Sequence, residues 1–283
     1  MPPRTTPTAR QQRLGAEMRK LREKAGMSAR EAGALLGGDQ ARISNIETGR
    51  VGLSADRVRT LACNYDCSDG GLIEALTGMT GERKRQWWEE YRGVLPPGML
   101  DIAELEHYAV ELRTAQTVSL PGLLQTVDHA RAVFREAVPA LPPPEIEHRL
   151  SHRIKRQAVL YRDAPLPYTA VIHEAALRMQ FGGRAASREQ LQHILDMSER
   201  AGVTVMAIPF AAGGFPGSGQ TIAYASGAVP QLDTVLLDQS HGPSLLDAEA
   251  QLAKYRDILD RLDRVALKPG ESRDFIREIA QSL

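Results

Sequence analysis

The side chains best suited to specific chemistry lie together in the segment 40–46, where hydrogen-bonding residues surround two isoleucines. The amide of Gln or Asn can both donate to and accept from the edge of adenine, and an Arg guanidinium can contact guanine O6 and N7 or a phosphate. If Ile43 and Ile46 face a protein core, the polar side chains lie on the outside of a helix, which would fit a DNA major groove about 12 Å wide. These polar residues are Gln40, Arg42, Ser44 and Asn45.

Two short helices joined by a tight turn are predicted to position this segment. Ser28, with Glu31 three residues later, is a capping box, so a helix should begin there. That helix should end at glycines 37–38, after which Asp39 caps a second helix that ends at Gly49. So short a turn makes the helices cross sharply and presents the second one outward, as in a helix-turn-helix. The first helix is predicted to bury Ala32, Leu35 and Leu36.

Three more helical patterns surround this pair. In the first, apolar residues from Leu14 to Ala25 recur at the spacing of one helix face. Ser54 opens the next, with Cys63 and Cys67 beside its apolar stripe and predicted to pack in the core, and a last short helix holds Leu72 and Leu76. We therefore predict a disordered arm over residues 1–10 and an all-α domain of five helices over residues 11–77.

The rest of the chain mixes helical and strand patterns. Residues 78–99 form a predicted linker helix that carries Trp87 and Trp88, which would pack it onto the following domain or across a dimer. Because strands and helices do not alternate strictly, residues 100–283 are predicted to be an α+β domain with a small sheet covered by helices. Strands are predicted at 167–173, 203–209, 221–225 and 234–238, and helices at 101–117, 122–136, 144–161, 187–201, 247–266 and 271–281.

Charge is distributed unevenly along the chain. The 35 basic and 35 acidic side chains balance overall. Residues 1–60 nevertheless carry 12 basic and 6 acidic side chains, whereas residues 101–283 carry 19 and 23. A basic first domain on a mildly acidic second one predicts an anionic partner for the first domain alone.

Residues 11–73 resemble the Cro/repressor-type helix-turn-helix domain, also called the xenobiotic-response-element (XRE) family. The resemblance lies in the run 21–28, the Leu36-Gly37 turn and the run Ile43-Ser44-Asn45-Ile46-Glu47-Thr48-Gly49-Arg50. It implies an ion pair between Arg22 and Glu47 that ties the first helix to the third. In place of the glutamine that contacts a phosphate in that family, this chain has Ala29, and Arg30 is expected to substitute for it. The residues implied to contact DNA are Gln40, Ala41, Arg42, Ser44, Asn45, Arg30 and Arg50.

The remainder resembles the antitoxin-like (Scr-type) C-terminal domain of unknown function found in actinobacterial regulators linked to differentiation and antibiotic production. The matching blocks are 118–132, 153–160, 173–178, 190–191 and 203–210. The resemblance implies a transcriptional regulator, often encoded beside a small protein that binds it.

Other motifs in the sequence lack residues that the chemistry they suggest would need. His148 and His152 have zinc-ligand spacing, but no third ligand is evident. The glycine-rich run 213–219 lacks the Lys-Ser/Thr of a phosphate loop. The adjacent pairs His173-Glu174 and Ser240-His241 lack an orienting third group, because neighbouring residues on a strand face opposite ways. We expect no metal, no cofactor and no enzymatic activity.

The expected protein is a DNA-binding regulator that acts as a homodimer on duplex DNA. Its second domain is expected to dimerise and to receive a small partner protein or an effector. No apolar run approaches the roughly 18 residues of a membrane span, and no secretory signal opens the sequence. A cytoplasmic location, on the nucleoid when DNA is bound, is therefore expected. Two alternatives stay open: an antitoxin-like protein that mainly sequesters a small partner, and a small-molecule sensor or enzyme in the second domain.

Overall fold

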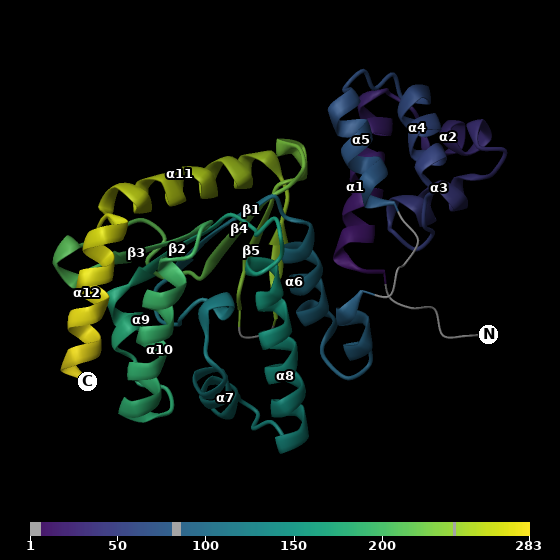
Figure 1. Ribbon diagram of the computed structural model, residues 1–283. Helices are drawn as coiled ribbons and strands as arrows, with labels where there is room; N and C mark the ends of the chain where they lie inside the picture. Colours follow the sequence, from purple (N-terminus) through teal and green to yellow (C-terminus); the bar gives the residue numbers. More distant parts are fainter. Residues whose placement is uncertain (1–6, 81–85, 240–241) are drawn as a thin grey trace. The chain divides into compact units, whose positions relative to one another are not determined.

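The computed structural model describes residues 7–80, 86–239 and 242–283, and the chain divides into two units, Met1–Glu90 and Tyr91–Leu283 (Figure 1). We describe each unit by itself. Residues 1–6 of the predicted arm, residues 81–85 of the predicted linker helix and the pair Ser240-His241 lie outside the described residues.

The first unit contains the predicted all-α head of five helices. Each helix follows a residue whose side chain accepts a hydrogen bond from the backbone N–H three residues later; these residues are Thr8, Ser28, Asp39, Ser54 and Asp69. Because Thr8 forms a capping box with Gln11, the first helix begins inside the predicted disordered arm, which corrects that prediction. The helices are α1 (Ala9–Lys24), α2 (Ala29–Leu35), α3 (Gln40–Glu47), α4 (Ala55–Asn64) and α5 (Gly70–Met79).

Most of the predicted apolar faces form the core of this unit. Within the five helices, the largest fully buried side chains are Met18, Ile43, Leu61 and Leu76. Two predictions are wrong. Leu35 lies on the outer side of α2 and is 50% exposed, and Cys63 is exposed, whereas Cys67 lies beyond α4, which ends through the left-handed residue Asp66.

The linker is not the single helix predicted over 78–99. A 3₁₀ helix covers Trp87–Tyr91, and α6 (Pro97–Tyr108) begins at Pro97. A proline is tolerated there because the first N–H groups of a helix have no carbonyl partner within the helix. Trp88 is only 2% exposed and meets Trp87 edge to face, with 5.6 Å between the ring centroids.

The second unit is built on a six-stranded mixed sheet with strand order β3-β2-β1-β4-β5-β6. The three strands β1, β2 and β3 are parallel, and β4, β5 and β6 continue the sheet from β1 in antiparallel pairs. The strands are β1 (Glu111–Gln116), β2 (Tyr168–His173), β3 (Val203–Ile208), β4 (Ile222–Ser226), β5 (Thr234–Leu237) and β6 (Ser244–Leu246).

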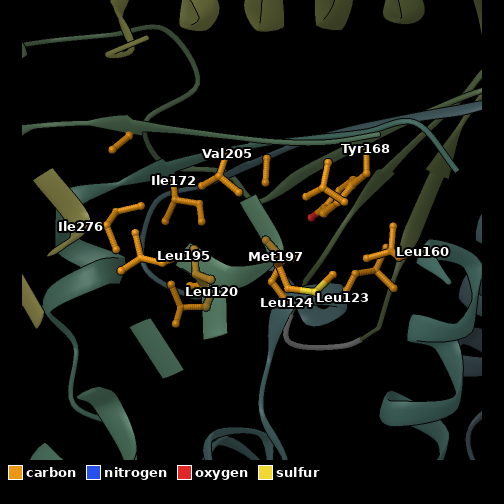
Figure 2. Close-up of a cluster of buried hydrophobic side chains, with 14 of the residues drawn as sticks. Leu120, Leu123, Leu124, Leu160, Tyr168, Ile172, Leu195, Met197, Val205 and Ile276 are labelled. Atoms are coloured by element: carbon orange, nitrogen blue, oxygen red, sulfur yellow. The ribbon is translucent and has the colours of Figure 1, made fainter. Parts of the chain in front are cut away.

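Helices cover both faces of this sheet (Figure 1). Alternate strand residues separate two cores, because successive side chains point to opposite faces. Tyr168 and Ile172 belong to the larger core with leucines of two 3₁₀ helices, Gly122–Leu124 and Gln157–Leu160 (Figure 2), whereas Val171 packs on the other face against α11. The helices are α7 (Val127–Arg135), α8 (Pro143–Arg156), α9 (Glu174–Arg178), α10 (Gly183–Ser198), α11 (Glu249–Val265) and α12 (Pro269–Ser282).

The α+β class is confirmed, but three elements were missed. The predicted helix 101–117 is in fact the end of α6 followed by β1, the strand at the centre of the sheet. The short elements β6 and α9 were not predicted. The four predicted strands correspond to β2, β3, β4 and β5.

Candidate nucleic-acid interface

The turn between α2 and α3 is tight because glycines let the backbone close on itself. Gly38 donates from its N–H to the carbonyl of Gly33 at 2.9 Å, and Gly37 adopts a φ of 61°. A Cβ on Gly33 would lie 2.6 Å from the carbonyl oxygen of Asp39, closer than real contacts allow. The start of α3 is thus fixed directly against α2.

Helix α3 has one inward and one outward face. Ile43 and Ile46 are buried, whereas Gln40, Ala41 and Ser44 are exposed and Arg42 and Asn45 are partly exposed. The outward face therefore carries an amide, a methyl group and a hydroxyl in its first two turns. These groups are complementary to the donors, acceptors and thymine methyl groups of base edges.

Arg42 differs from its exposed neighbours because its side chain folds back over the turn. A Cβ on Gly38 would lie 2.8 Å from Cδ of Arg42, so only glycine leaves this path open. The backbone N–H of Arg42 donates to the Asp39 side chain at 2.9 Å, which caps α3. This path directs the guanidinium towards the start of α3.

Arg22 and Glu47 form a bidentate ion pair between α1 and the end of α3. Arg22 Nε donates to Glu47 Oε1 at 2.6 Å and Nη2 donates to Oε2 at 3.0 Å, and each side chain is only 9% exposed. Nη1 donates to the carbonyl of Met27 at 2.6 Å. The hydrogen bonds to Glu47 raise the pKa of Arg22. The pair therefore joins α1, the loop after it and the end of α3.

Backbone contacts hold the other side of α3. A Cβ on Gly15 of α1 would lie 2.5 Å from the carbonyl oxygen of Ile46, and one on Gly49 would lie 2.8 Å from the backbone of Gln11. The backbones of α1 and the end of α3 therefore touch. The position of α3 in the unit is set by backbone contact as well as by its isoleucines.

Basic side chains of this unit fall into two groups. On α1, Arg13 pairs with Glu17 at 2.8 Å and Arg19 pairs with Glu23 at 2.7 Å. A second group makes no ion pair with any residue in the described ranges 7–80, 86–239 and 242–283; it consists of Lys24, Arg30, Arg42, Arg50 and Arg57. All of these except the partly exposed Arg42 are exposed, and three belong to the helix-turn-helix or follow it directly.

The candidate enzymatic pair in the second unit has structural partners. His173 Nδ1 accepts from the backbone N–H of Ala175 at 3.2 Å, so this histidine caps α9. Glu174 accepts from Arg178 Nε at 2.6 Å and from the backbone N–H of Phe210 at 2.7 Å. His173 therefore fixes the start of α9, and Glu174 holds the loops after β2 and β3 together.

Comparison with protein families agrees with this division of the chain. Residues 13–76 match the family described as a helix-turn-helix domain, and residues 99–278, more than half of the chain, match the family described as domain of unknown function (DUF5753). The chain belongs to the DUF5753 family. No curated protein and no solved structure matches it. The helix-turn-helix match indicates a DNA-binding regulator, and the DUF5753 match assigns no role to the second unit.

In this DUF5753 protein, two of the unpaired cations were not among the predicted site residues. Lys24 ends α1 and Arg57 lies in the first turn of α4. The excess of basic residues in the segment 1–60 signalled such cations, but only the structure shows which of them have acidic partners. None of the helices in the described part of the chain has the length and apolar composition of a membrane span.

Proposed function

We propose that the protein is a sequence-specific transcriptional regulator that inserts α3 into the major groove of duplex DNA. Gln40, Ala41 and Ser44 would meet base edges, with Asn45 at the margin of the contact. Arg42, folded towards the start of α3, would meet a phosphate. Arg30 and Arg50 would contact phosphates on either side of the groove, because phosphate contacts set the position of a protein on DNA.

The observation that carries this proposal is the coincidence of two patterns on one helix-turn-helix. The outward face of α3 carries hydrogen-bonding side chains, and the cations next to it, Arg30, Arg42 and Arg50, have no acidic partner in the described part of the chain. Elsewhere in the unit, acidic neighbours neutralise Arg13 and Arg19 of α1. Positive charge is therefore left where a polyanion would lie.

We further propose that the protein binds as a homodimer to two half-sites about 34 Å apart, one turn of DNA. The second unit would supply the dimer contact and respond to an effector or to a small partner protein. The resemblance of the sequence to XRE-type actinobacterial regulators supports a role in development or antibiotic production. Transcript profiling of a deletion strain tests that role.

Selection from a random duplex library tests the DNA-binding proposal. The full-length protein should enrich one motif, with two half-sites if it binds as a dimer. Fluorescence anisotropy on that motif should give an affinity that falls steeply with salt, because bound phosphates release counterions. Arg30→Gln and Arg50→Gln should each reduce the slope of log binding constant against log salt concentration by about one. Each should weaken binding to all DNA sequences by the same factor. Arg149→Gln, in the second unit, is the matched control. If the library yields no enriched motif, the proposal fails.

A further inference from the structure

A buried polar cluster in the second unit surrounds Arg153 of α8, beside the 3₁₀ helix Gly122–Leu124. Arg153 Nη1 donates to Gln125 Oε1 at 2.6 Å. Gln125 cannot turn its amide around, because its Nε2 donates to the carbonyl of Leu120 at 2.8 Å. The guanidinium also lies over the ring of Phe134, 4.8 Å from its centroid. Arg153 is thus held in place by two neutral groups.

Among the residues that the structure describes, Arg153 forms no ion pair, unlike its neighbours Arg149 and Arg156 on α8. Arg149 pairs with Glu145 at 2.6 Å, and Arg156 pairs with Glu106 at 2.5 Å. Arg153 forms no ion pair with a residue of the ranges 7–80, 86–239 or 242–283. Its Nε is buried without an acceptor, and its Nη2 donates to none of these residues either.

The acidic groups whose charge acts on Arg153 are Glu106, which pairs with Arg156, and Asp238, which forms no ion pair with Arg153. Burial, followed by repulsion from Arg156, lowers the pKa of Arg153 to about 10, so the guanidinium remains protonated at neutral pH. His129 and His152 are buried and neutral at that pH, with pKa values lowered to about 4 and about 3. A cation that is partly withdrawn from water and forms no ion pair is unfavourable, and an anion would relieve that cost.

We propose that Arg153 anchors a binding site for the oxyanion of a small molecule, a carboxylate or a phosphate group. The anion would engage the Nε–Nη2 edge, which is the edge that binds such groups with two parallel hydrogen bonds. Gln125 holds the opposite corner of the guanidinium, so this edge is pre-positioned. Gly122 lets the backbone pack closely on the Nη1 side of the guanidinium, since a Cβ there would lie only 3.3 Å from Nη1. The site does not depend on the proposed DNA binding and would make the second unit a receptor for an anionic effector.

The internal carboxylate that competes with this proposal belongs to Asp238, which follows β5. It favours the charged form of both Arg153 and Arg156 electrostatically but forms no ion pair with either. If Asp238 were the true occupant in solution, removing its charge would open the site to added anions. The experiment therefore includes Asp238→Asn.

Titration of the ¹⁵N-labelled full-length protein tests the site. The Nε–H resonance of Arg153, assigned by its loss in Arg153→Lys, is followed with sodium phosphate and, separately, sodium acetate, against sodium chloride at equal ionic strength. We expect a saturable shift with one of the two oxyanions and a matching rise in Tm of the second unit. The anion that produces the shift shows whether the site binds a phosphate group or a carboxylate.

Arg153→Lys should lose the anion-dependent rise in Tm, because an ammonium cannot bind with two parallel hydrogen bonds. Arg149→Lys, on the same helix, should keep both responses. Arg153→Met removes the charge, and its melting curve in chloride shows that the unit folds without it. No saturable shift beyond chloride, an unchanged rise in Tm in Arg153→Lys, or a shift confined to Asp238→Asn would each overturn the proposal.

Discussion

At the scale of single residues, the side chains of α3 that face outward and those that hold the helix are separate sets. Gln40 and Ser44 are exposed and contribute nothing to the core, whereas Ile43 and Glu47 hold the helix in place. Substitutions in the first set should therefore change recognition without changing stability, and those in the second should do the reverse.

Gln40→Ala tests the first half of this separation. Losing the amide should relax the preference at one base position by about 1–3 kcal/mol while thermal stability stays the same. Competition binding with motifs that differ at single positions measures the preference. Gln192→Ala, the same change at an exposed position of α10, should leave binding untouched. An equal loss on every sequence would identify Gln40 as a phosphate contact instead.

Glu47→Ala tests the second half. The change leaves Arg22 partly buried without its carboxylate, and we expect the first unit to lose about 2–3 kcal/mol of unfolding free energy. Chemical denaturation followed by circular dichroism measures the loss. The control is Glu74→Ala, which breaks an exposed pair with Arg59 in the same unit and should have no measurable effect. A loss no larger than that of the control would show that the pair does not stabilise the fold.

At the scale of elements, the packing of the helical unit depends on glycines as much as on apolar side chains. Gly15→Ala would drive a methyl group into the carbonyl of Ile46, which cannot move without displacing α3. We expect a loss of about 1–3 kcal/mol, as for other overpacked sites, and weaker DNA binding. Gly78→Ala in α5 meets open space and should stabilise the unit by about 0.5–1 kcal/mol. Urea denaturation of the two variants should show opposite signs; equal losses would contradict the packing argument.

Capping residues explain why the helices of the first unit could be predicted from the sequence. Ser28, Asp39 and Ser54 act locally, so their pattern indicates a helix start without knowledge of the fold. The outward side of α2 could not be predicted in the same way. Leu35 fits the apolar spacing, yet its exposure depends on where α3 crosses, and that depends on the glycine turn.

Strand β1 shows the opposite case. Its sequence, Glu-Leu-Arg-Thr-Ala-Gln, consists mostly of helix formers, and its polar residues conceal a strand that is paired on both edges. Thr114 is tolerated inside because its hydroxyl bonds that of Tyr168 at 2.9 Å. Strands β2 and β4, which pair with β1, lie far from it in the sequence. The contacts with them override the local helix propensity of β1, and a single sequence does not reveal such contacts.

At the scale of the whole molecule, the two units should respond differently to pH. Burial, followed by repulsion from Arg153 for His129 and from Arg156 for His152, lowers the pKa of these histidines from 6.5 to about 4 and about 3. Below pH 6.5 these two histidines are protonated in the unfolded chain, whereas they stay neutral in the folded unit until the pH approaches 4. The stability of the second unit should therefore be constant above about pH 7 and fall as the pH drops towards 4, by up to about 1.4 kcal/mol per pH unit for each histidine.

His193 has a pKa that burial lowers as well, so His129→Leu should remove part of this pH dependence and leave the rest. Guanidinium denaturation of the full-length protein between pH 7 and pH 4.5, followed in the second unit, measures it. The matched control is His148→Leu, which alters an exposed histidine of α8 and should leave the dependence unchanged. If His129→Leu also leaves it unchanged, His129 is protonated in the folded protein and the argument from burial is wrong.

The glycines on which α3 rests have a consequence for how this protein could diverge. Gly33 packs against the residue before α3, and Gly15 and Gly49 allow close backbone contact at the end of α3. The position of the helix is therefore set by main-chain atoms. Exchanging Gln40, Ala41 or Ser44 alters none of those contacts. A descendant of this protein could therefore acquire a different target sequence through a few surface substitutions, while the tilt and depth of the helix stay inherited.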